Sequence, residues 1–427
     1  CMRILQEAGV AVEVMTTSRS ASRYDFLNAR NELLLCFAGA DQIGPGGWPV
    51  ANMIHQPSVE AALRRSLLTN SGAQLHGGWE LKACADDGSG VTALVVTPEG
   101  ERTVRARYLV GADGARSPLR EASGIAFDDL NFEEPWLVVD MLVDDPARLP
   151  TANLQICDPE RPTTCVLMAE GRHRWEFMIK PGETSEQVSD DAFVEKLLEP
   201  WNVKGAVRIE RTAVYTFRAR VAEKWRKGRI LLAGDAAHQT PPFAGQGMCS
   251  GLRDAANLAW KLAAVLHGEA QDQLLDSYQR EREPHARATI DMAIMMGRLV
   301  CTTNKWSAFV RDMKLKIAGK LGKLPDGPPS YPPISNGVIL AGSPAAGSYF
   351  PQYVAQNGTR LDSLIGIGPH LLSREDLAED HLKPFAEPLA AWFESAHADA
   401  VLIRPDRYVF GTGSPAGLQA AWRAAQA

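Results

Sequence analysis

The sequence predicts a mixed protein, part α/β and part α+β, built from three units. Two strands, at 108–110 and 230–233, each lead into a glycine-containing loop and the start of a helix, which is the pattern of an α/β unit. The stretch between them carries mostly strand-like runs, which predicts a sheet-rich unit. A Pro- and Gly-rich segment at 324–351 separates a final unit. With 427 residues, 45% of them hydrophobic, the chain can bury a large core.

The amino-terminal part combines helices with strands. Residues 2–10 predict the end of a helix, and residues 23–36 predict a hairpin that turns near Asn28 to Asn31. Apolar residues recur at helical spacing over 57–68, which predicts a helix. Residues 74–110 alternate between apolar and polar side chains, so we expect a small antiparallel meander there.

The middle part, residues 132–220, predicts several strands and one helix near 190–198. The strand-like runs are 136–142, 164–168, 174–179 and 207–217. After the buried strand at 230–233, apolar spacing predicts a long helix over 251–266, and the helical pattern continues to about Leu299.

Composition and charge exclude several classes of function. Lys plus Arg total 45 and Asp plus Glu total 51, a net charge of −6, so we expect no nucleic-acid partner. The sequence contains no run of about twenty consecutive apolar residues, so we expect no integral membrane span. The seven cysteines form no CxxC pair, which favours free thiols in a reducing, cytoplasmic setting over disulfides or a metal site. Cys1 as the first residue favours a chain that starts inside a longer protein over a lipidated cysteine.

The first loop that suggests ligand chemistry is Gly111-Ala112-Asp113-Gly114-Ala115-Arg116-Ser117-Pro118-Leu119-Arg120. Ser117 is suited to cap a helix that starts at Pro118, where free N–H groups favour an anion. The alternative is an ordinary strand-to-helix turn with solvated arginines.

The second such loop runs from Gly234 to Met248 and joins the buried strand to the long helix. Asp235, at the carboxyl end of the strand, is suited to accept hydrogen bonds from ligand hydroxyls. Gly245-Gln246-Gly247 stands just before a helix N-terminus, which favours negative charge on a ligand. The alternative is a tight connection whose buried Asp caps the next helix.

These residues resemble a known family. GADGARSPLR is similar to the DG motif, and GRILLAGDAAHQTPPFAGQGMCSGLRDAANLAWKL to the GD motif, of FAD-dependent aromatic hydroxylases related to para-hydroxybenzoate hydroxylase. Shorter segments resemble the 3-(3-hydroxyphenyl)propionate hydroxylases of that family; they are Trp48-Pro49, Gln56 to Glu60, Arg174 to Met178 and Tyr278 to Ala286. The resemblance covers nearly the whole chain.

The resemblance implies three domains. A Rossmann-type FAD-binding domain of the glutathione-reductase kind would comprise residues 1–130 and 225–325. A substrate-binding β-sheet domain would comprise 131–224, and a thioredoxin-like domain without a redox CxxC would comprise 335–427. Relatives begin with a βαβ unit that carries GxGxxG, but no GxGxxG occurs in this sequence, so we expect the first βαβ unit to be missing. At Cys249 the most studied relatives have Asn.

The resemblance also implies FAD as cofactor and NADH or NADPH as co-substrate. In the family the reduced flavin forms a C4a-hydroperoxide with O2 and transfers oxygen to a phenolic ring, so the cofactor carries the oxygen chemistry. Pro242 would cover the flavin ring near the reacting carbon without offering an N–H. The residues implied to bind the cofactor are Gln56, Asp113, Arg116, Gly234, Asp235, Pro242, Gly245, Gly247, Met248 and Cys249.

Substrate-directed residues are open at this point. His238 is a candidate for proton transfer near the flavin, and a buried structural histidine is the equal alternative. Arg174 and Arg218 are candidates for pairing with a substrate carboxylate, although an ordinary salt bridge is the commoner outcome for each.

The sequence thus predicts hydroxylation of a small phenolic compound similar to 3-(3-hydroxyphenyl)propionate, in aromatic catabolism. One alternative is an antibiotic-tailoring hydroxylase that acts on a polycyclic substrate. A second is a non-catalytic remnant that binds no flavin, because the GxGxxG unit is missing. A homodimer also stays open.

Overall fold

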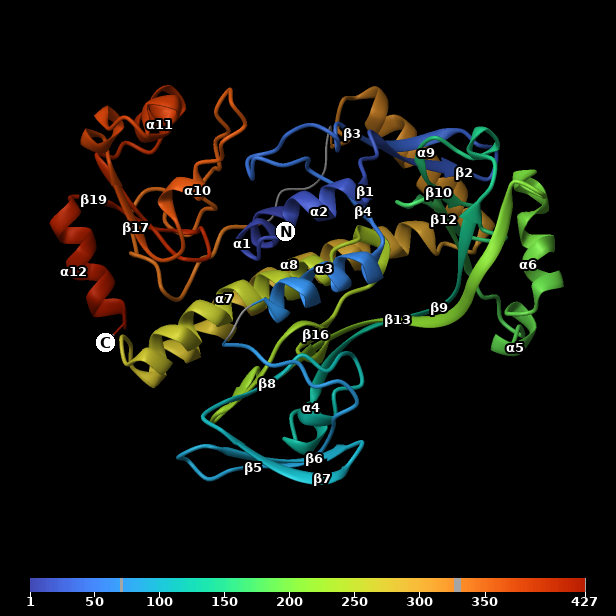
Figure 1. Ribbon diagram of the computed structural model, residues 1–427. Coiled ribbons are helices and arrows are strands. Elements are labelled where there is room, and N and C mark those ends of the chain that lie inside the picture. Colours follow the sequence, from blue (N-terminus) through green and yellow to red (C-terminus); the bar gives the residue numbers. More distant parts are fainter. Residues whose placement is uncertain (70–71, 326–331, 427) are drawn as a thin grey trace.

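The computed structural model describes residues 1–69, 72–325 and 332–426. Two long helices, α7 (Gly247–His267) and α8 (Asp276–Val300), pack against each other through the middle of the molecule (Figure 1). Sheets and shorter helices surround them, so the mixed α/β architecture that the sequence predicts is confirmed.

An eight-stranded sheet forms the largest layer, and α8 contacts its strands β10 and β13 (Figure 1). Its strand order is β16-β13-β9-β12-β11-β10-β2-β3, antiparallel except for the β10–β2 pair. The strands are β2 (Arg23–Asn28), β3 (Leu33–Ala38), β9 (Phe127–Val143), β10 (Asn153–Cys157), β11 (Thr163–Leu167), β12 (Arg172–Met178), β13 (Val207–Ala222) and β16 (His238–Gln239).

The two faces of this sheet have different partners. Trp175 and Phe177 of β12 pack with Val194 and Leu198 of α6 (Asp191–Leu198), and Val188 of α5 (Ser185–Val188) joins the same cluster. Trp136 of β9 faces the other way, into the core cluster that also contains the apolar side of α8. Alternation of buried and half-buried residues along β12 follows from this two-sided packing.

The predicted hairpin at 23–36 forms β2 and β3, and it belongs to the eight-stranded sheet. The sequence placed it in the 1–130 unit, away from the middle strands. The structure pairs β2 in parallel with β10, from Tyr24 opposite Asn153 to Asn28 opposite Cys157. Local periodicity does not reveal such pairing between distant segments.

A smaller sheet positions the two candidate loops. In it β8 (Leu109–Gly111) runs parallel to β15 (Ile230–Leu232), and β14 (Arg226–Lys227) flanks β15. The predicted meander forms β5 (Glu80–Asp86), β6 (Val91–Thr97) and β7 (Gly100–Ala106), and α4 (Pro118–Ala122) packs on it.

The amino-terminal helices lie along the central pair (Figure 1). They are α1 (Met2–Glu7), α2 (Ala11–Thr16) and α3 (Gln56–Leu68), accompanied by the short pair β1 (Ser18–Arg19) and β4 (Met53–Ile54). Their apolar sides form one cluster with Trp48, and α1 contacts α7.

The carboxyl-terminal part is a three-stranded antiparallel sheet with helices, at the far end of α7 (Figure 1). Its elements are α10 (Asp362–Ile365), β17 (His370–Ser373), α11 (Ala386–Ser395), β18 (Ala400–Ile403), β19 (Val409–Gly413) and α12 (Pro415–Gln426). Helix α9 (Lys305–Lys320) precedes it and packs on β3. Of the predicted boundary at 324–351, residues 326–331 lie outside the described residues. No helix in the described ranges has the length and apolar character needed to cross a bilayer.

Candidate functional site

Two loops meet at one edge of the small parallel sheet. Gly111, the last residue of β8, stands opposite Leu232, the last residue of β15, so the residues that follow both strands leave at the same edge. The side-chain amide of Gln239 donates to the backbone carbonyl of Ala115 at 2.9 Å and joins the two loops. This arrangement brings Asp113 and Arg116 to the same edge as Gly234 and Asp235.

The two aspartates of these loops differ in their contacts. The Asp113 carboxylate accepts a hydrogen bond from the backbone N–H of Leu119 at 2.9 Å, which helps to start α4. Ser117 caps the same helix through the N–H of Arg120. Asp235 is exposed, and no hydrogen bond to its carboxylate is found within the described residues. Its oxygens are therefore available to a ligand.

The start of α7 offers unpaired N–H groups. Gly245 adopts a left-handed backbone with φ of 62°, and α7 begins two residues later without a side-chain cap and without an acidic residue in its first turn. Met248 and Cys249 lie half-buried in that turn. A Cβ at Gly245 or Gly114 would meet no atom within 4 Å, so both loops border open space. This helix terminus is suited to a negatively charged group.

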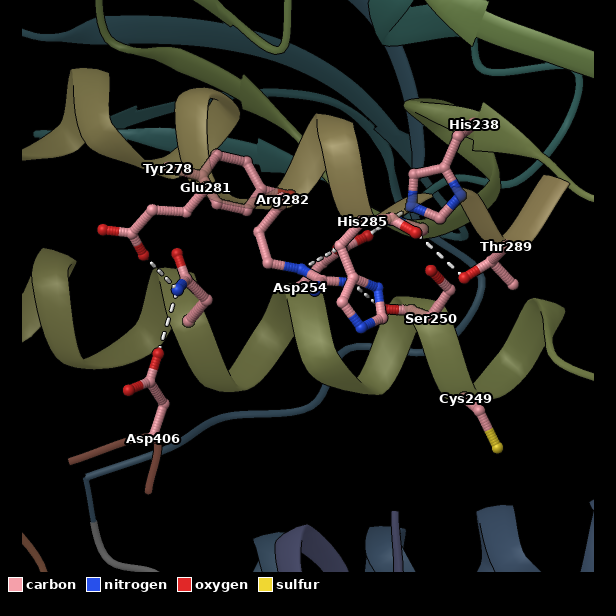
Figure 2. A network of polar contacts seen from close by, with 12 residues as sticks. His238, Cys249, Ser250, Asp254, Tyr278, Glu281, Arg282, His285, Thr289 and Asp406 are labelled. Carbon is pink, nitrogen blue, oxygen red and sulfur yellow. Dashed lines mark hydrogen bonds and ion pairs between the residues drawn. The ribbon is translucent and has the colours of Figure 1, made fainter. Parts of the chain in front are cut away.

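A buried carboxylate holds the second loop against α7 (Figure 2). Asp254 accepts hydrogen bonds from the N–H of Gly234 at 3.1 Å, from Nε2 of His238 at 2.6 Å and from Nε of Arg282 at 2.9 Å. Burial alone would raise the pKa of Asp254, but His238 and Arg282 outweigh it and lower the pKa to about 2. The loop approaches α7 so closely that a Cβ on Gly251 would lie 3.4 Å from the Cα of Gly234.

His238 lies inside this buried set and not on the open side of the loop. Its side chain is 0% exposed, and its ring lies 5.1 Å from the ring of Trp225. The contact with Asp254 occupies Nε2. This geometry favours a structural role, and a role of His238 in proton transfer stays a prediction.

A second buried network joins α7 and α8 to the carboxyl-terminal part. Nη2 of Arg404 lies 2.6 Å from Glu281 and 2.7 Å from Asp406. Nζ of Lys261 lies 2.8 Å from Glu281, and the Asn257 amide donates to both carboxylates. Burial lowers the pKa of Lys261 to about 8, against the opposing charge of Glu281. We call these five residues the clamp.

The arginines predicted for a substrate carboxylate already have acidic partners. Nε of Arg174 lies 2.7 Å from Asp140, and Nη2 of Arg218 lies 2.9 Å from Glu133 in an exposed pair. Gln56 is exposed in the first turn of α3, and within the described residues no hydrogen bond joins it to either loop. Pro242 is exposed and lies in the second loop, beside the buried Phe243.

Sequence reasoning missed several of the residues that shape the site. Asp254 and Arg282 were not singled out. Asp254 lies 16 residues from His238 and 28 residues from Arg282 in sequence, so local patterns do not reveal these contacts. Glu176 was also missed, although a signal was present. Over 172–178 polar and apolar residues alternate, which places Arg174 and Glu176 on one face of a strand.

Comparison with known proteins bears on both loops. Residues 1–293 match the family model of the FAD binding domain, and residues 380–427 match that of the HcaD C-terminal domain. The chain belongs to the FAD-binding aromatic hydroxylase family. This confirms the resemblance on which the cofactor prediction depends.

Two curated relatives show how far the similarity of this chain reaches. This chain is 41% identical over 319 residues to a 3-(3-hydroxy-phenyl)propionate/3-hydroxycinnamic acid hydroxylase from Mycolicibacterium smegmatis, and the match covers 74% of this chain and 56% of the relative. The chain is also 34% identical over 447 residues to a probable NADH-specific resorcinol 4-hydroxylase from Rhodococcus jostii, and this match covers 96% of the chain and 82% of the relative. The chain thus spans little more than half the length of the first relative.

Solved structures confirm the fold of the chain. Aklavinone-11 hydroxylase, in a ternary complex with FAD and aklavinone, is 25% identical with a TM-score of 0.76, covering 100% of this chain and 90% of the other. The flavin-dependent monooxygenase PieE reaches a TM-score of 0.78 at 20% identity, with the same coverage.

The two loops of this chain fit FAD. A ribitol chain carries hydroxyl donors, which suit the exposed and unpaired Asp235 carboxylate. The uncapped start of α7 suits the pyrimidine edge of a flavin, which becomes anionic on reduction. The open space beside Gly114 and Gly245 leaves room for a ligand to approach the backbone.

Proposed function

We propose that this protein is a hydroxylase that adds oxygen to a phenolic compound of the 3-(3-hydroxyphenyl)propionate type, with FAD as cofactor and NADH or NADPH and O2 as co-substrates. One observation carries the proposal: the free Asp235 carboxylate and the uncapped start of α7 meet at the edge where both loops leave parallel strands. FAD supplies the redox and oxygen chemistry when bound. The chain's own residues bind it, orient it and exclude water.

The proposed roles follow from the position of each residue. Asp235 accepts hydrogen bonds from the ribitol, and the backbone N–H groups of Met248 and Cys249 face the pyrimidine edge. Pro242 covers the ring without offering an N–H. Further cofactor contacts are assigned to Gln56, Asp113, Arg116, Gly234, Gly245 and Gly247.

The proposal includes the finer division of the fold. Residues 1–130 and 225–325 would form the Rossmann-type FAD domain, 131–224 the substrate domain and 335–427 the thioredoxin-like domain. The parallel β8–β15 pair supports the first, and the three-stranded sheet with α11 and α12 supports the last. A homodimer stays a prediction, which light scattering on the purified chain tests.

The test begins with the visible spectrum of the purified chain after incubation with FAD and removal of free flavin. A retained band near 450 nm, followed by NADH oxidation that 3-(3-hydroxyphenyl)propionate stimulates and a catechol product, is the expected result. A chain that retains no flavin contradicts the proposal and favours the non-catalytic remnant.

A polycyclic substrate is the second candidate. The fold similarity to aklavinone-11 hydroxylase favours it. The same NADH oxidation assay with an anthracyclinone in place of the phenylpropanoid separates the two, because only the true substrate class couples NADH oxidation to a hydroxylated product.

A further inference from the structure

A band of polar side chains crosses one face of the eight-stranded sheet. Cross-strand partners share a face, and the register places Thr164 opposite Glu176, Arg174 opposite Asp140, and Gln155 opposite Thr164. The Tyr24 hydroxyl on β2 reaches the same face and donates to Gln155 at 3.0 Å. We call this set the polar strip; its members are Tyr24, Asp140, Gln155, Thr164, Arg174 and Glu176.

The polar strip lies on the face that the second loop covers. Trp136 stands opposite Met178, two residues along β12 from Glu176, so its side chain is on the same face. The ring of Trp136 lies 5.6 Å from the ring of Phe243, which belongs to the loop between Asp235 and α7. The strip is therefore next to the part of the molecule that we propose to hold the flavin.

Glu176 has no hydrogen-bond partner within the described residues, whereas every other member of the strip has one. Arg174 donates to both oxygens of Asp140, at 2.7 and 3.3 Å. The Thr164 hydroxyl donates to Gln155 at 3.0 Å. The nearest cationic atom to Glu176 is Nη1 of Arg174, at 3.9 Å, although the Glu176 side chain is only 13% exposed. A carboxylate accepts and does not donate, so a ligand that supplies a donor would satisfy it.

The charges of the strip exclude one kind of ligand group. Asp140 already neutralises Arg174, and Glu176 adds a negative charge, so a substrate carboxylate would be repelled here. Burial raises the pKa of Glu176, with Arg174 opposing and Asp140 adding to the rise. Burial and the Glu176 charge also raise the pKa of Tyr24, which stays a neutral donor.

We propose that Glu176 accepts a hydrogen bond from the phenolic hydroxyl of the substrate, and that the polar strip directs any substrate carboxylate away from this end of the sheet. The inference rests on the proposed function and adds an orientation to it. It also assigns Arg174 to holding Asp140 and not to binding the substrate.

The test measures binding by calorimetry with the full chain, so that it does not depend on turnover. Three ligands separate the groups: 3-(3-hydroxyphenyl)propionate, 3-phenylpropionate without the hydroxyl, and resorcinol without the carboxylate. We expect Glu176→Gln to raise the Kd of both phenols about tenfold and to leave 3-phenylpropionate unchanged or bound more tightly. Glu210→Gln, at an exposed pair with Arg172 on the same sheet, is the matched control and should change none of the three.

Unchanged Kd values of both phenols in Glu176→Gln overturn the inference. An equal loss of affinity for 3-phenylpropionate also overturns it. Binding of the phenols without hydroxylation contradicts the proposed function alone, because the calorimetry still reports on Glu176. Wild-type protein that binds none of the three ligands contradicts both. If Glu176→Gln fails to fold by circular dichroism, Glu176→Asp, which keeps the charge and shortens the reach, should show the same selective loss.

Discussion

The backbone N–H of Gly234 donates to the carboxylate of Asp254, at 3.1 Å, across 20 residues of sequence. Gly234 stands directly before Asp235, so the helix α7 sets the conformation of the loop that presents the free carboxylate. The same Asp254 oxygen also contacts Nε2 of His238 at 2.6 Å. One buried oxygen thus holds both ends of a five-residue turn.

Asp254→Asn is expected to destabilise the fold. The substitution leaves the fully buried Arg282 without its acidic partner, which costs about 3–5 kcal/mol when one partner of a buried pair is removed. Urea unfolding followed by circular dichroism measures the change. Asp291→Asn, at an exposed position on α8, is the control and should cost less than about 0.5 kcal/mol. Equal stability of the two variants would contradict the role of Asp254.

Asp235→Ala should weaken flavin binding and leave the fold stable. The carboxylate is exposed and makes no hydrogen bond in the described structure, so its loss removes ligand contacts alone. We expect the Kd of FAD to rise about tenfold or more, measured by quenching of flavin fluorescence. Asp113→Ala makes an informative comparison, because it also removes the acceptor for Leu119 N–H and should lower the Tm. An unchanged Kd in Asp235→Ala would count against the proposed cofactor contact.

Arg404→Met should loosen the carboxyl-terminal part. The change leaves Glu281 and Asp406 close together with their shared cation removed, and the expected cost is about 3–5 kcal/mol. Limited proteolysis should then cut between α9 and β17 earlier than in the wild type. Arg423→Met, at an exposed position of α12, is the control. A proteolysis pattern like that of the wild type would show that the clamp does not hold this part in place.

Stability should fall between pH 6.5 and 4 because of His173. Burial lowers the pKa of this histidine from 6.5 to about 4, so the folded state binds the proton less readily than the unfolded state. The contribution is complete above pH 6.5 and is lost as the pH falls towards 4; it amounts to about 3 kcal/mol. His173→Phe keeps the ring stacked on Trp175 and should flatten the pH dependence of the unfolding free energy. In the control His76→Phe, which replaces an exposed imidazole ring stacked on Trp79 with a phenyl ring, the pH dependence of the unfolding free energy should stay as in the wild type.

Sequence patterns predicted the local elements well, and the reasons are physical. Helical spacing predicted α3 and most of α7, and the strand-like run at 23–36 with a turn near Asn28 to Asn31 predicted the β2–β3 hairpin, because each signal depends on neighbours in sequence. The glycines of the two candidate loops were also predicted from neighbouring residues, because each loop stands between a strand pattern and a helix pattern.

Relationships between distant residues were not predictable in this way. Asp113 and Asp235 each follow a strand of the small parallel sheet. Asp113 accepts a hydrogen bond from the N–H of Leu119 and helps to start α4, whereas Asp235 has no such partner within the described residues. The parallel pairing of β2 with β10 and the partners of Asp254 likewise depend on how the chain returns on itself. Whether each predicted site residue acts on cofactor or substrate stays a prediction.

Glu281 and Arg282 are neighbours on α8, yet they serve different parts of the molecule: Glu281 belongs to the clamp, and Arg282 holds Asp254. The carboxyl-terminal part is therefore not an interchangeable module. A chimera that takes this part from one relative must take the matching faces of α7 and α8 as well. Otherwise the exchange places charged residues of different origin against each other in two buried networks.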